Sequence, residues 1–216
     1  MEGRKKKYLF FDLDGTLTRG DTFTGFIRHV FGTAGLLRVL AVSAPAILLW
    51  KAGFKDNTYA KLRMFSAAFR GMRAEEFRSR GASFASVIDR MARPESMQRL
   101  RKAAADRETV AIVSASLGDW IRPWAQRNGV GIVISTEAET DPHGRLTGRF
   151  STPNCQRGEK SRRILETFPD LGGKRDRCFV EAWGDSAGDI EMFALADKTV
   201  NPKSGETHSR PSCPSR

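Results

Sequence analysis

Cysteine is scarce in this 216-residue sequence, which contains three: Cys155, Cys178 and Cys213. No two of them are close enough along the chain to form a CxxC motif. An odd number without that spacing argues against a disulfide framework and against a zinc site. It favours a reducing compartment such as the cytoplasm.

Long apolar runs are also lacking. The basic residues 4–7 resemble the start of a secretory signal, but the apolar run after them ends at Asp12, too early for a signal core. The most apolar segment is residues 36–50, which Pro45 is expected to interrupt. Its uncharged part, residues 39–50, is shorter than the ~20 residues that a membrane-spanning helix needs. We therefore expect a buried helix here, or one that lies at a membrane interface.

Acidic residues are the minority among the charged ones. Lys and Arg number 36 and Asp and Glu number 25, so the formal net charge is +11. This charge favours anionic partners such as phosphorylated metabolites, acidic lipid surfaces or nucleic acid. The aromatic residues are mainly Phe within apolar runs, without a stacking platform or a recognition motif. A nucleic-acid-binding module is therefore the weaker interpretation.

What the sequence does contain is an acidic pair after a short apolar run. Residues 8–11 are predicted to form a buried strand, and Asp12 and Asp14 follow it before Gly15 ends the strand. Side chains two apart on an extended chain point to the same side. In an open α/β sheet, ligands bind at the carboxyl ends of the strands. Two carboxylates there either repel each other and require a divalent cation, or are solvated acids beside a glycine turn.

The chain divides into two kinds of sequence. Residues 22–94 carry apolar residues at helical spacing, so they are predicted to form an all-helical insertion. The residues after it alternate strands and helices, which indicates a parallel sheet with right-handed crossovers. A hairpin is expected between residues 133–139 and 146–150. The predicted organisation is a core of residues 1–21 and 95–201, a helical insertion at 22–94 and a loose tail at 202–216.

Three further segments carry candidate chemistry. One predicted strand, 109–114, ends in hydroxyl groups that can bond a phosphoryl oxygen or cap the next helix. One lysine lies at the start of a predicted helix, where it is either solvated or placed to neutralise a phosphate. A strand at 178–183 is followed by two acids that form either a capped turn or part of a metal site. The residues concerned are Ser114, with Ser116 or Asp119 as the helix cap, Lys160, and Asp185 with Asp189.

Together these segments resemble the four motifs of the haloacid dehalogenase superfamily, most of whose members are Mg-dependent phosphatases. The matching residues are Asp12-Leu-Asp14-Gly-Thr, Ser114, Asn154-Cys155-x-x-Gly158-x-Lys160 and Gly184-Asp185-Ser186-x-x-Asp189, in that order. The third motif resembles the phosphoserine-phosphatase-like branch in particular. The resemblance implies a Rossmann-like parallel-sheet core with a helical cap inserted after the first strand.

The resemblance also implies a role for each matching residue. Asp12 would attack phosphorus and form an aspartyl-phosphate, and Asp14 would act as an acid and then as a base. Ser114 and Lys160 would bind the phosphoryl group. The Mg²⁺ ligands that the resemblance assigns are Asp12, the Asp14 carbonyl and Asp185, with Asp189 supporting them.

The helical insertion sets the expected substrate. It contains 12 Lys/Arg against 4 Asp/Glu, a net charge of +8, and its uncharged run lies between Arg38 and Lys51. The combination of a basic insertion, an uncharged apolar run and the segment Phe69-Arg70-Gly71 resembles the cap sequence of bacterial phosphatidylglycerophosphatase C. The resemblance implies a lipid phosphate such as phosphatidylglycerophosphate as the substrate. It also implies peripheral contact between residues 36–50 and the inner face of the membrane.

Two alternatives remain open. The first is a phosphatase of a small soluble metabolite such as phosphoserine or histidinol phosphate. In that case Asp21 would hold the substrate amine and Arg63 its carboxylate, with Lys61 as the competitor of Arg63. The second is a catalytically inactive interaction protein, which the presence of every matching acid and of Ser114 and Lys160 disfavours.

Overall fold

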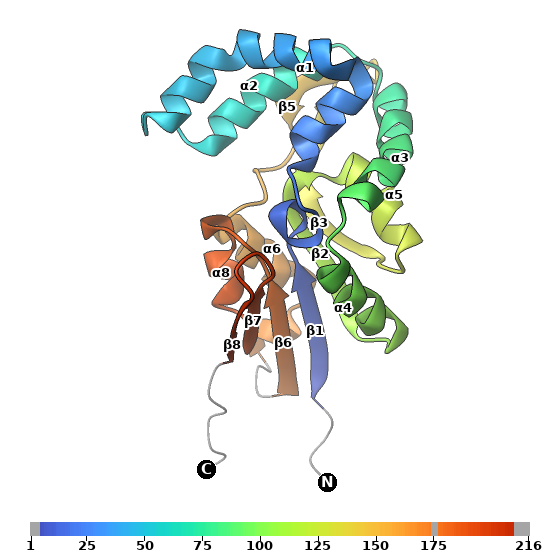
Figure 1. The fold of residues 1–216 in the computed structure, drawn as a ribbon, viewed down its shortest axis with the longest axis vertical. Helices are drawn as coiled ribbons and strands as arrows, with labels where there is room; N and C mark the ends of the chain where they lie inside the picture. The colour runs from blue at the N-terminus through green and yellow to red at the C-terminus, as the bar shows by residue number, and fades with distance from the viewer. Residues whose placement is uncertain (1–4, 174–176, 210–216) are drawn as a thin grey trace.

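Strand β1 (Lys6–Phe11) lies at the centre of the computed structural model, which describes residues 5–173 and 177–209 (Figure 1). It pairs in parallel with β2 (Thr109–Leu117) on one side and with β6 (Cys178–Trp183) on the other. The sheet order is β3-β2-β1-β6-β7-β8, with β3 (Ile132–Thr136), β7 (Lys198–Asn201) and β8 (Glu206–Ser209). The predicted α/β fold with a mostly parallel sheet is confirmed.

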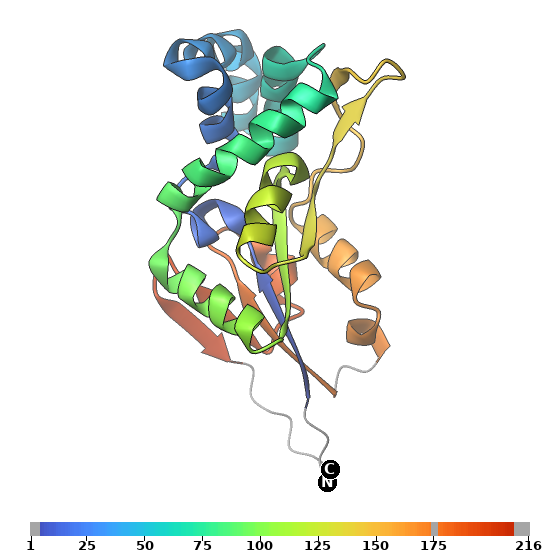
Figure 2. The same ribbon diagram turned by 90° about the vertical axis from the view of Figure 1, so that its right-hand side faces the viewer.

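Helices cover both faces of this sheet, which explains the unbroken apolar run of β1. Tyr8 and Phe10 pack into one hydrophobic cluster and Leu9 and Phe11 into another, because neighbouring side chains on a strand point to opposite faces. Figure 2 shows the two helical layers on opposite sides of β1. On one side are α4 (Pro94–Ala105) and α5 (Gly118–Arg127), and on the other α6 (Gly158–Thr167), α7 (Asp170–Gly173) and α8 (Ile190–Phe193).

The insertion after β1 forms a helical layer beyond the carboxyl ends of the strands (Figure 1). It consists of α1 (Thr22–Lys51), α2 (Asn57–Phe69) and α3 (Ala74–Met91), and we call these three helices the cap. Helix α1 bends at Gly32, whose φ of 70° is outside the helical region. The helix continues through Pro45, contrary to the expected interruption. Ala41 and Pro45 are both exposed, so water can reach the carbonyl that loses its helical donor there.

A small hairpin ties the cap to the core. Its strands are β4 (Ala138–Thr140) and β5 (Leu146–Phe150), so the predicted hairpin exists but begins later, because residues 132–136 belong to the main sheet. Leu146 exchanges backbone hydrogen bonds with the turn that follows α2: Gly71 N donates to Leu146 O (2.8 Å), and Leu146 N donates to Met72 O (2.9 Å). The hairpin therefore holds the cap in place, in addition to the two chain connections before α1 and after α3.

The expectation of a loose tail at 202–216 is wrong for residues 206–209. These residues form β8, which pairs antiparallel with β7. The chain reverses at a turn in which the Asn201 side chain accepts from the backbone N–H groups of Lys203 (2.9 Å) and Ser204 (3.2 Å). All four residues of β8 are exposed and show no apolar alternation, so their pattern could not predict a strand. Residues 210–216 lie outside the described part of the chain.

Candidate active site

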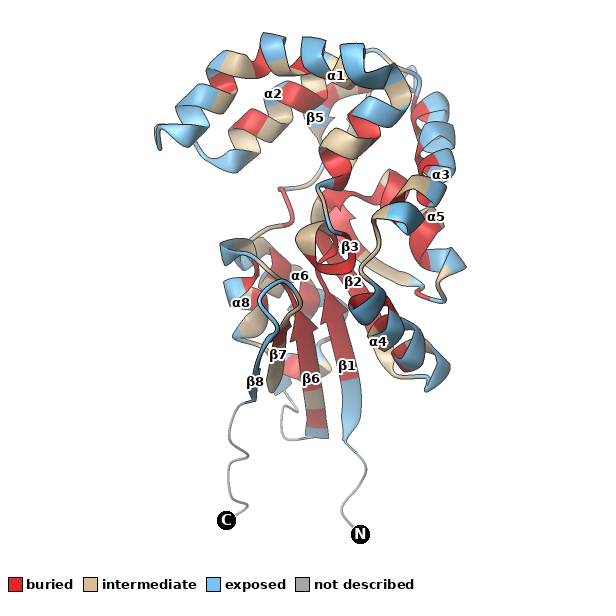
Figure 3. Ribbon diagram, viewed as in Figure 1, coloured by how far each residue is buried: buried red, intermediate tan, exposed pale blue. Residues whose placement is uncertain are grey.

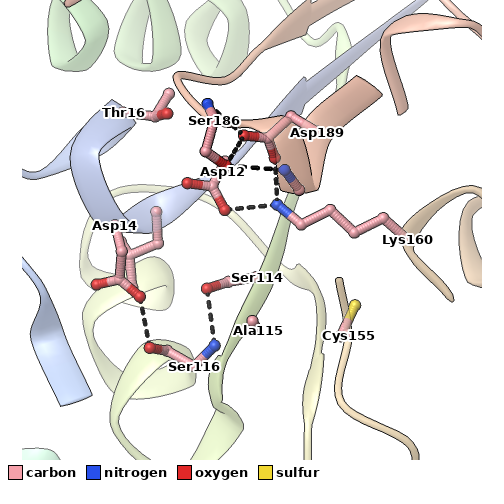
Figure 4. Close-up of polar contacts among 12 residues, drawn as sticks. Asp12, Asp14, Thr16, Ser114, Ala115, Ser116, Cys155, Lys160, Ser186 and Asp189 are labelled. Atoms are coloured by element: carbon pink, nitrogen blue, oxygen red, sulfur yellow. Dashed lines mark hydrogen bonds and ion pairs between the residues drawn. The ribbon is translucent and has the colours of Figure 1, made fainter. Parts of the chain in front are cut away.

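Asp12 lies at the carboxyl end of β1, where its backbone N–H donates to Trp183 O at 2.9 Å and so continues the ladder to β6. Its side chain is buried, and Oδ1 accepts a hydrogen bond from Lys160 Nζ at 2.6 Å (Figure 4). Burial raises the pKa of the Asp12 carboxyl. Lys160 opposes this rise, and the nearby Asp189 and Asp14 add to it.

Lys160 joins two buried carboxylates. Its Nζ also donates to Asp189 Oδ1 at 2.6 Å, and its side chain is buried in the first turn of α6. Burial alone would lower the pKa of the Lys160 ammonium, but the two carboxylates raise it above its ordinary value. The lysine therefore stays charged. Figure 4 shows its nitrogen between Asp12 and Asp189, in contact with both.

Asp189 is held from both sides. While Oδ1 accepts from Lys160, Oδ2 accepts from the Ser186 backbone N–H (3.1 Å) and from Ser186 Oγ (2.8 Å) in a capping box. Both oxygens already have protein donors. The arrangement suits the supporting role expected for Asp189 better than the role of a direct metal ligand.

Asp185 approaches β1 through a glycine. Gly15 has a φ of 87°, and a Cβ built there would lie 2.2 Å from Asp185 Oδ2. Only glycine allows both this backbone conformation and this close approach. Asp185 Oδ1 in turn accepts from Thr16 Oγ1 at 3.3 Å. The Asp-Gly-Thr sequence after the first acid therefore brings the half-buried Asp185 beside Asp12.

These acids fit a divalent cation. Among the described residues, Asp12, Asp185 and Asp189 each offer a ligand atom within 4.8 Å of the others. A hard cation such as Mg²⁺ prefers oxygen ligands of this kind, from one or two carboxylates together with substrate phosphate and water. Asp12 and Asp185 are the residues that would hold it. The expected contribution of the Asp14 carbonyl stays a prediction.

Asp14 is fixed by a hydrogen-bond network that joins the core to the cap. Its Oδ1 accepts from the backbone N–H of Thr22 in α1 (2.6 Å), and its Oδ2 accepts from Ser116 Oγ (2.5 Å). Thr22 Oγ1 donates to Ser116 Oγ (3.1 Å), and Trp120 Nε1 donates to Thr22 Oγ1 (3.3 Å). Burial raises the pKa of the Asp14 carboxyl, against the effect of these donors. A carboxyl of this kind is suited to carrying a proton.

The hydroxyls at the carboxyl end of β2 have partners other than those expected. Neither Ser116 nor Asp119 caps α5 with its side chain, because the helix begins at Gly118 after Leu117. Ser116 instead binds Asp14, a contact that sequence reasoning missed because the partners are 102 residues apart. Ser114 is buried and accepts from the Ser116 backbone N–H (3.0 Å). Its own hydroxyl proton remains available for an acceptor near Asp12.

A cavity of about 470 Å³ lies between these groups and the cap. On the core side it is lined by Asp12, Asp14 and Lys160. On the cap side the lining is mainly apolar, with Phe23, Leu40, Ile47 and Trp50 from α1 and Ala60 and Met64 from α2. The polar side chains on this side are Thr24, Asn57 and Lys61. The cavity can therefore accept a group with a charged end and an apolar end.

The two residues predicted to hold a serine-like substrate are placed differently. Asp21 lines the cavity, but its Oδ1 accepts from Thr24 N (2.7 Å) as the N-cap of α1. Arg63 is exposed on α2 and does not line the cavity. Its competitor Lys61 does line it, and Lys61 Nζ donates to Ala115 O at 2.6 Å. The helical register of α2 therefore selects Lys61 over Arg63.

Comparison with known proteins agrees with this fold. The family model for haloacid dehalogenase-like hydrolases matches residues 9–194. Protein CicA of Caulobacter vibrioides is 28% identical over 200 residues, which cover 91% of this chain and 86% of that protein. A protein with unknown function from Bordetella pertussis Tohama I has a TM-score of 0.74 at 20% identity, covering 91% of this chain and 89% of that one.

A further solved structure has a similar fold. It is a phospho-aspartyl intermediate analogue of phosphoserine phosphatase, with a TM-score of 0.63 at 19% identity, covering 91% of this chain and 86% of that one. The expected likeness to the phosphoserine-phosphatase-like branch is thereby confirmed for the fold. Because the family model covers most of the sequence, the chain belongs to the family of haloacid dehalogenase-like hydrolases.

Proposed function

We propose that this protein is a Mg²⁺-dependent phosphomonoester hydrolase that acts through an aspartyl-phosphate on Asp12. The observation that carries the proposal is the arrangement of Asp12, which is buried at a strand end, bonded to Lys160 and close to two further acids. The likeness of the fold to a phospho-aspartyl analogue of phosphoserine phosphatase supports it.

In the first step, an oxygen of Asp12 attacks phosphorus while the bond from phosphorus to the ester oxygen breaks. Asp14 donates its proton to the departing alkoxide, which leaves as the alcohol. The network of Ser116 and Thr22 holds the Asp14 carboxyl in position for this transfer. The raised pKa of Asp14, which follows from its burial, favours the protonated form that the step requires.

In the second step, Asp14 takes a proton from a water molecule whose oxygen attacks phosphorus. The bond from phosphorus to Asp12 breaks, which releases inorganic phosphate and restores both carboxyl groups. Lys160 and Ser114 would donate to the phosphoryl oxygens, and Asp189 holds Lys160 in place. Mg²⁺ bound by Asp12 and Asp185 would neutralise charge between the carboxylates and the phosphate.

The cavity favours a lipid phosphate as the substrate. Its core side is acidic and basic, whereas its α1 side presents Leu40, Ile47 and Trp50. A phosphate bound at Asp12 would place the rest of the ester against this apolar wall, which suits an acyl-bearing ester such as phosphatidylglycerophosphate. The corresponding place of action is the cytoplasm, at the inner face of the membrane.

A soluble phosphate ester remains the second candidate, because Asp21 and Lys61 also line the cavity. An acidic and a basic side chain that line one cavity could hold the amine and the carboxylate of a substrate such as phosphoserine. Against it, Asp21 already caps α1 and Lys61 already donates to Ala115 O.

The experiment is phosphate release with and without Mg²⁺ from phosphatidylglycerophosphate, lysophosphatidate, phosphoserine, histidinol phosphate and p-nitrophenyl phosphate. We expect release only with Mg²⁺, and fastest from the two lipids. Preference for phosphoserine would establish the soluble ester instead. Absence of release from all five would contradict the proposal.

A further inference from the structure

The outer face of α1 is apolar although it faces solvent. Figure 3 shows this part of the cap as largely exposed. Most of the exposed large apolar side chains of the described residues belong to this helix and the turn after it. We define the α1 outer face by its members Leu37, Val42, Pro45, Leu48 and Leu49 on the helix and Phe54 in the following turn.

The opposite side of the same helix is apolar as well. Val39 and Ala46 are buried, and Leu40 and Ile47 line the cavity. A cap helix that only had to cover the cavity would need one apolar side and a polar one. The outer face is therefore not explained by packing inside the protein, and Leu48, which is 65% exposed, needs a covering from outside.

Helix α3 shows what an ordinary outer face looks like in this cap. Its buried side consists of Phe77, Phe84 and Ile88, and its exposed side carries Glu76 and Arg80, which form an ion pair. This helix is amphipathic, as expected for a helix that is covered on one side by protein and on the other by water. The α1 outer face departs from this arrangement.

The charges next to the α1 outer face are mainly basic, and the acid that follows it, Asp56, caps α2 by accepting from Tyr59 N. The sequence between residues 31 and 55 contains Arg38, Lys51 and Lys55 and no acidic residue. A patch of apolar side chains bordered by basic ones fits an anionic bilayer, into which the apolar groups insert while the basic groups meet the lipid phosphates. We propose that the α1 outer face docks the protein on the surface of an anionic membrane.

Helix α1 lies on the bilayer in this proposal and does not cross it. By length and composition alone it could cross, since its most apolar window has a mean hydropathy of 1.7 and is 17% buried. However, Thr22 at its start donates to Asp14, and Leu40 and Ile47 form the wall of the cavity. Crossing would remove these contacts, whereas lying flat keeps them and covers only the exposed side.

The docking surface adjoins the mouth of the cavity. Trp50 lines the cavity and is also 40% exposed at the end of the α1 outer face. On the basis of the proposed function, a lipid phosphate could move from the bilayer past Trp50 while its phosphate approaches Asp12. Binding to the membrane itself does not depend on hydrolysis.

The test is co-sedimentation of the full chain with vesicles of phosphatidylcholine alone and of phosphatidylcholine mixed with phosphatidylglycerol. We expect binding to the mixed vesicles that weakens with added salt, because exposed charges are screened. Val42→Glu combined with Leu48→Glu should weaken binding at least about tenfold, since two inserted apolar groups are lost. Each of Lys51→Ala and Lys55→Ala should weaken it roughly fivefold.

Matched controls separate this surface from general effects. Ile190→Glu changes an exposed apolar side chain on α8, and Lys203→Ala removes an exposed lysine after β7, so both should bind as the unchanged protein does. Asp12→Asn should also bind normally, whether or not the protein hydrolyses any ester. Unchanged thermal unfolding of the Val42→Glu, Leu48→Glu variant would show that it folds.

Two results would overturn the proposal. One is an absence of binding to the mixed vesicles by the unchanged protein at low salt. The other is equal binding by the Val42→Glu, Leu48→Glu variant. If the unchanged protein is instead a dimer that this variant converts to a monomer, without vesicle binding, the α1 outer face is an interface between two copies.

Discussion

The two sides of the cavity are built on different physical principles. On the core side, Asp12, Lys160 and Asp189 are buried and Asp14 is partly buried. Each of the four is fixed by hydrogen bonds of 2.5 to 2.8 Å. On the cap side, the wall is formed mainly by apolar side chains of α1 and α2. The difference suggests that the sheet edge fixes the chemistry and that the cap fixes which ester is accepted.

The largest expected effect follows from removing the nucleophile. Asp12→Asn should lower phosphate release at least about a thousandfold, because an amide cannot form the acyl phosphate. The measurement is release of inorganic phosphate with Mg²⁺. Asp106→Asn, which changes an exposed acid directly after α4, is the matched control and should keep full activity. Undiminished turnover by the Asp12→Asn protein would contradict the role of Asp12 as the nucleophile.

The second-largest effect should come from removing the buried ammonium group of Lys160. Lys160→Met leaves Asp12 and Asp189 facing each other without a cation, so we expect turnover to fall about 100- to 1,000-fold. Breaking a buried ion pair also costs about 3–5 kcal/mol of unfolding free energy. Kinetics together with thermal unfolding tests both expectations. Lys102→Met, at an exposed pair, should change neither, and an equal loss in that variant would point to a nonspecific effect.

Mg²⁺ should stabilise the protein in a pH-dependent way. Burial raises the pKa of Asp12 from its ordinary 3.8 to about 7, so in metal-free protein this group favours folding at acid pH. That contribution is lost as the pH rises through this range. The cation competes with protons for the same carboxylates, so its stabilisation should be larger at pH 8 than at pH 6.

At a concentration far above its dissociation constant, Mg²⁺ should add about 2–3 kcal/mol, or roughly 5–10 °C in Tm. Differential scanning fluorimetry at the two pH values measures this. Asp185→Asn should remove most of the shift. A shift that is equal at both pH values, or that persists in Asp185→Asn, would speak against a site formed by these carboxylates.

The network that orients Asp14 should contribute less. Ser116→Ala removes one of the two donors to the Asp14 carboxyl, and we expect about a tenfold fall in kcat with little change in KM. The basic limb of the pH–kcat profile, where Asp14 loses the proton that the first step requires, should also move to higher pH, because a lost donor raises the pKa of Asp14 further. Ser116→Thr keeps the hydroxyl and should restore most of the rate. If Ser116→Ala only lowers Tm, the hydroxyl is structural.

The cap wall should have the smallest effect, and only on some esters. Each methylene buried against Leu40 and Ile47 should raise kcat/KM about fourfold until the wall is covered. Ile47→Asn should reduce this gain for long alkyl phosphates and leave methyl phosphate unchanged. Leu49→Asn, on the outer face of the same helix, is the control. Equal losses for long and short esters would contradict a selective role for the wall.

The core was more predictable from sequence than the cap. The strands with buried faces and the acids after them lie close to their predicted places, because a doubly buried strand and a glycine turn leave a local pattern. The contact between Ser116 and Asp14 left none, since it depends on how β2 and α1 meet in space. The choice of Lys61 over Arg63 also needed the register of α2. The two residues are two positions apart, and the sequence alone does not show which of them faces the cavity.

The continuation of α1 through Pro45 could not be predicted for a related reason. Pro45 predicts an interruption, yet the helix passes through Pro45 and bends instead at Gly32. Contacts with α2 and with the core maintain it, and such tertiary contacts outweigh local propensity. Strand β8 shows the opposite case, in which an exposed polar segment is ordered by pairing with its neighbour.

The most direct test of the division between core and cap is kcat/KM for a series of monoalkyl phosphates of increasing chain length, measured with Mg²⁺. We predict turnover of every member and a steady rise with chain length. Faster hydrolysis of phosphoserine than of any long alkyl phosphate would contradict selection by the apolar wall. No turnover of any member would contradict the chemistry assigned to Asp12.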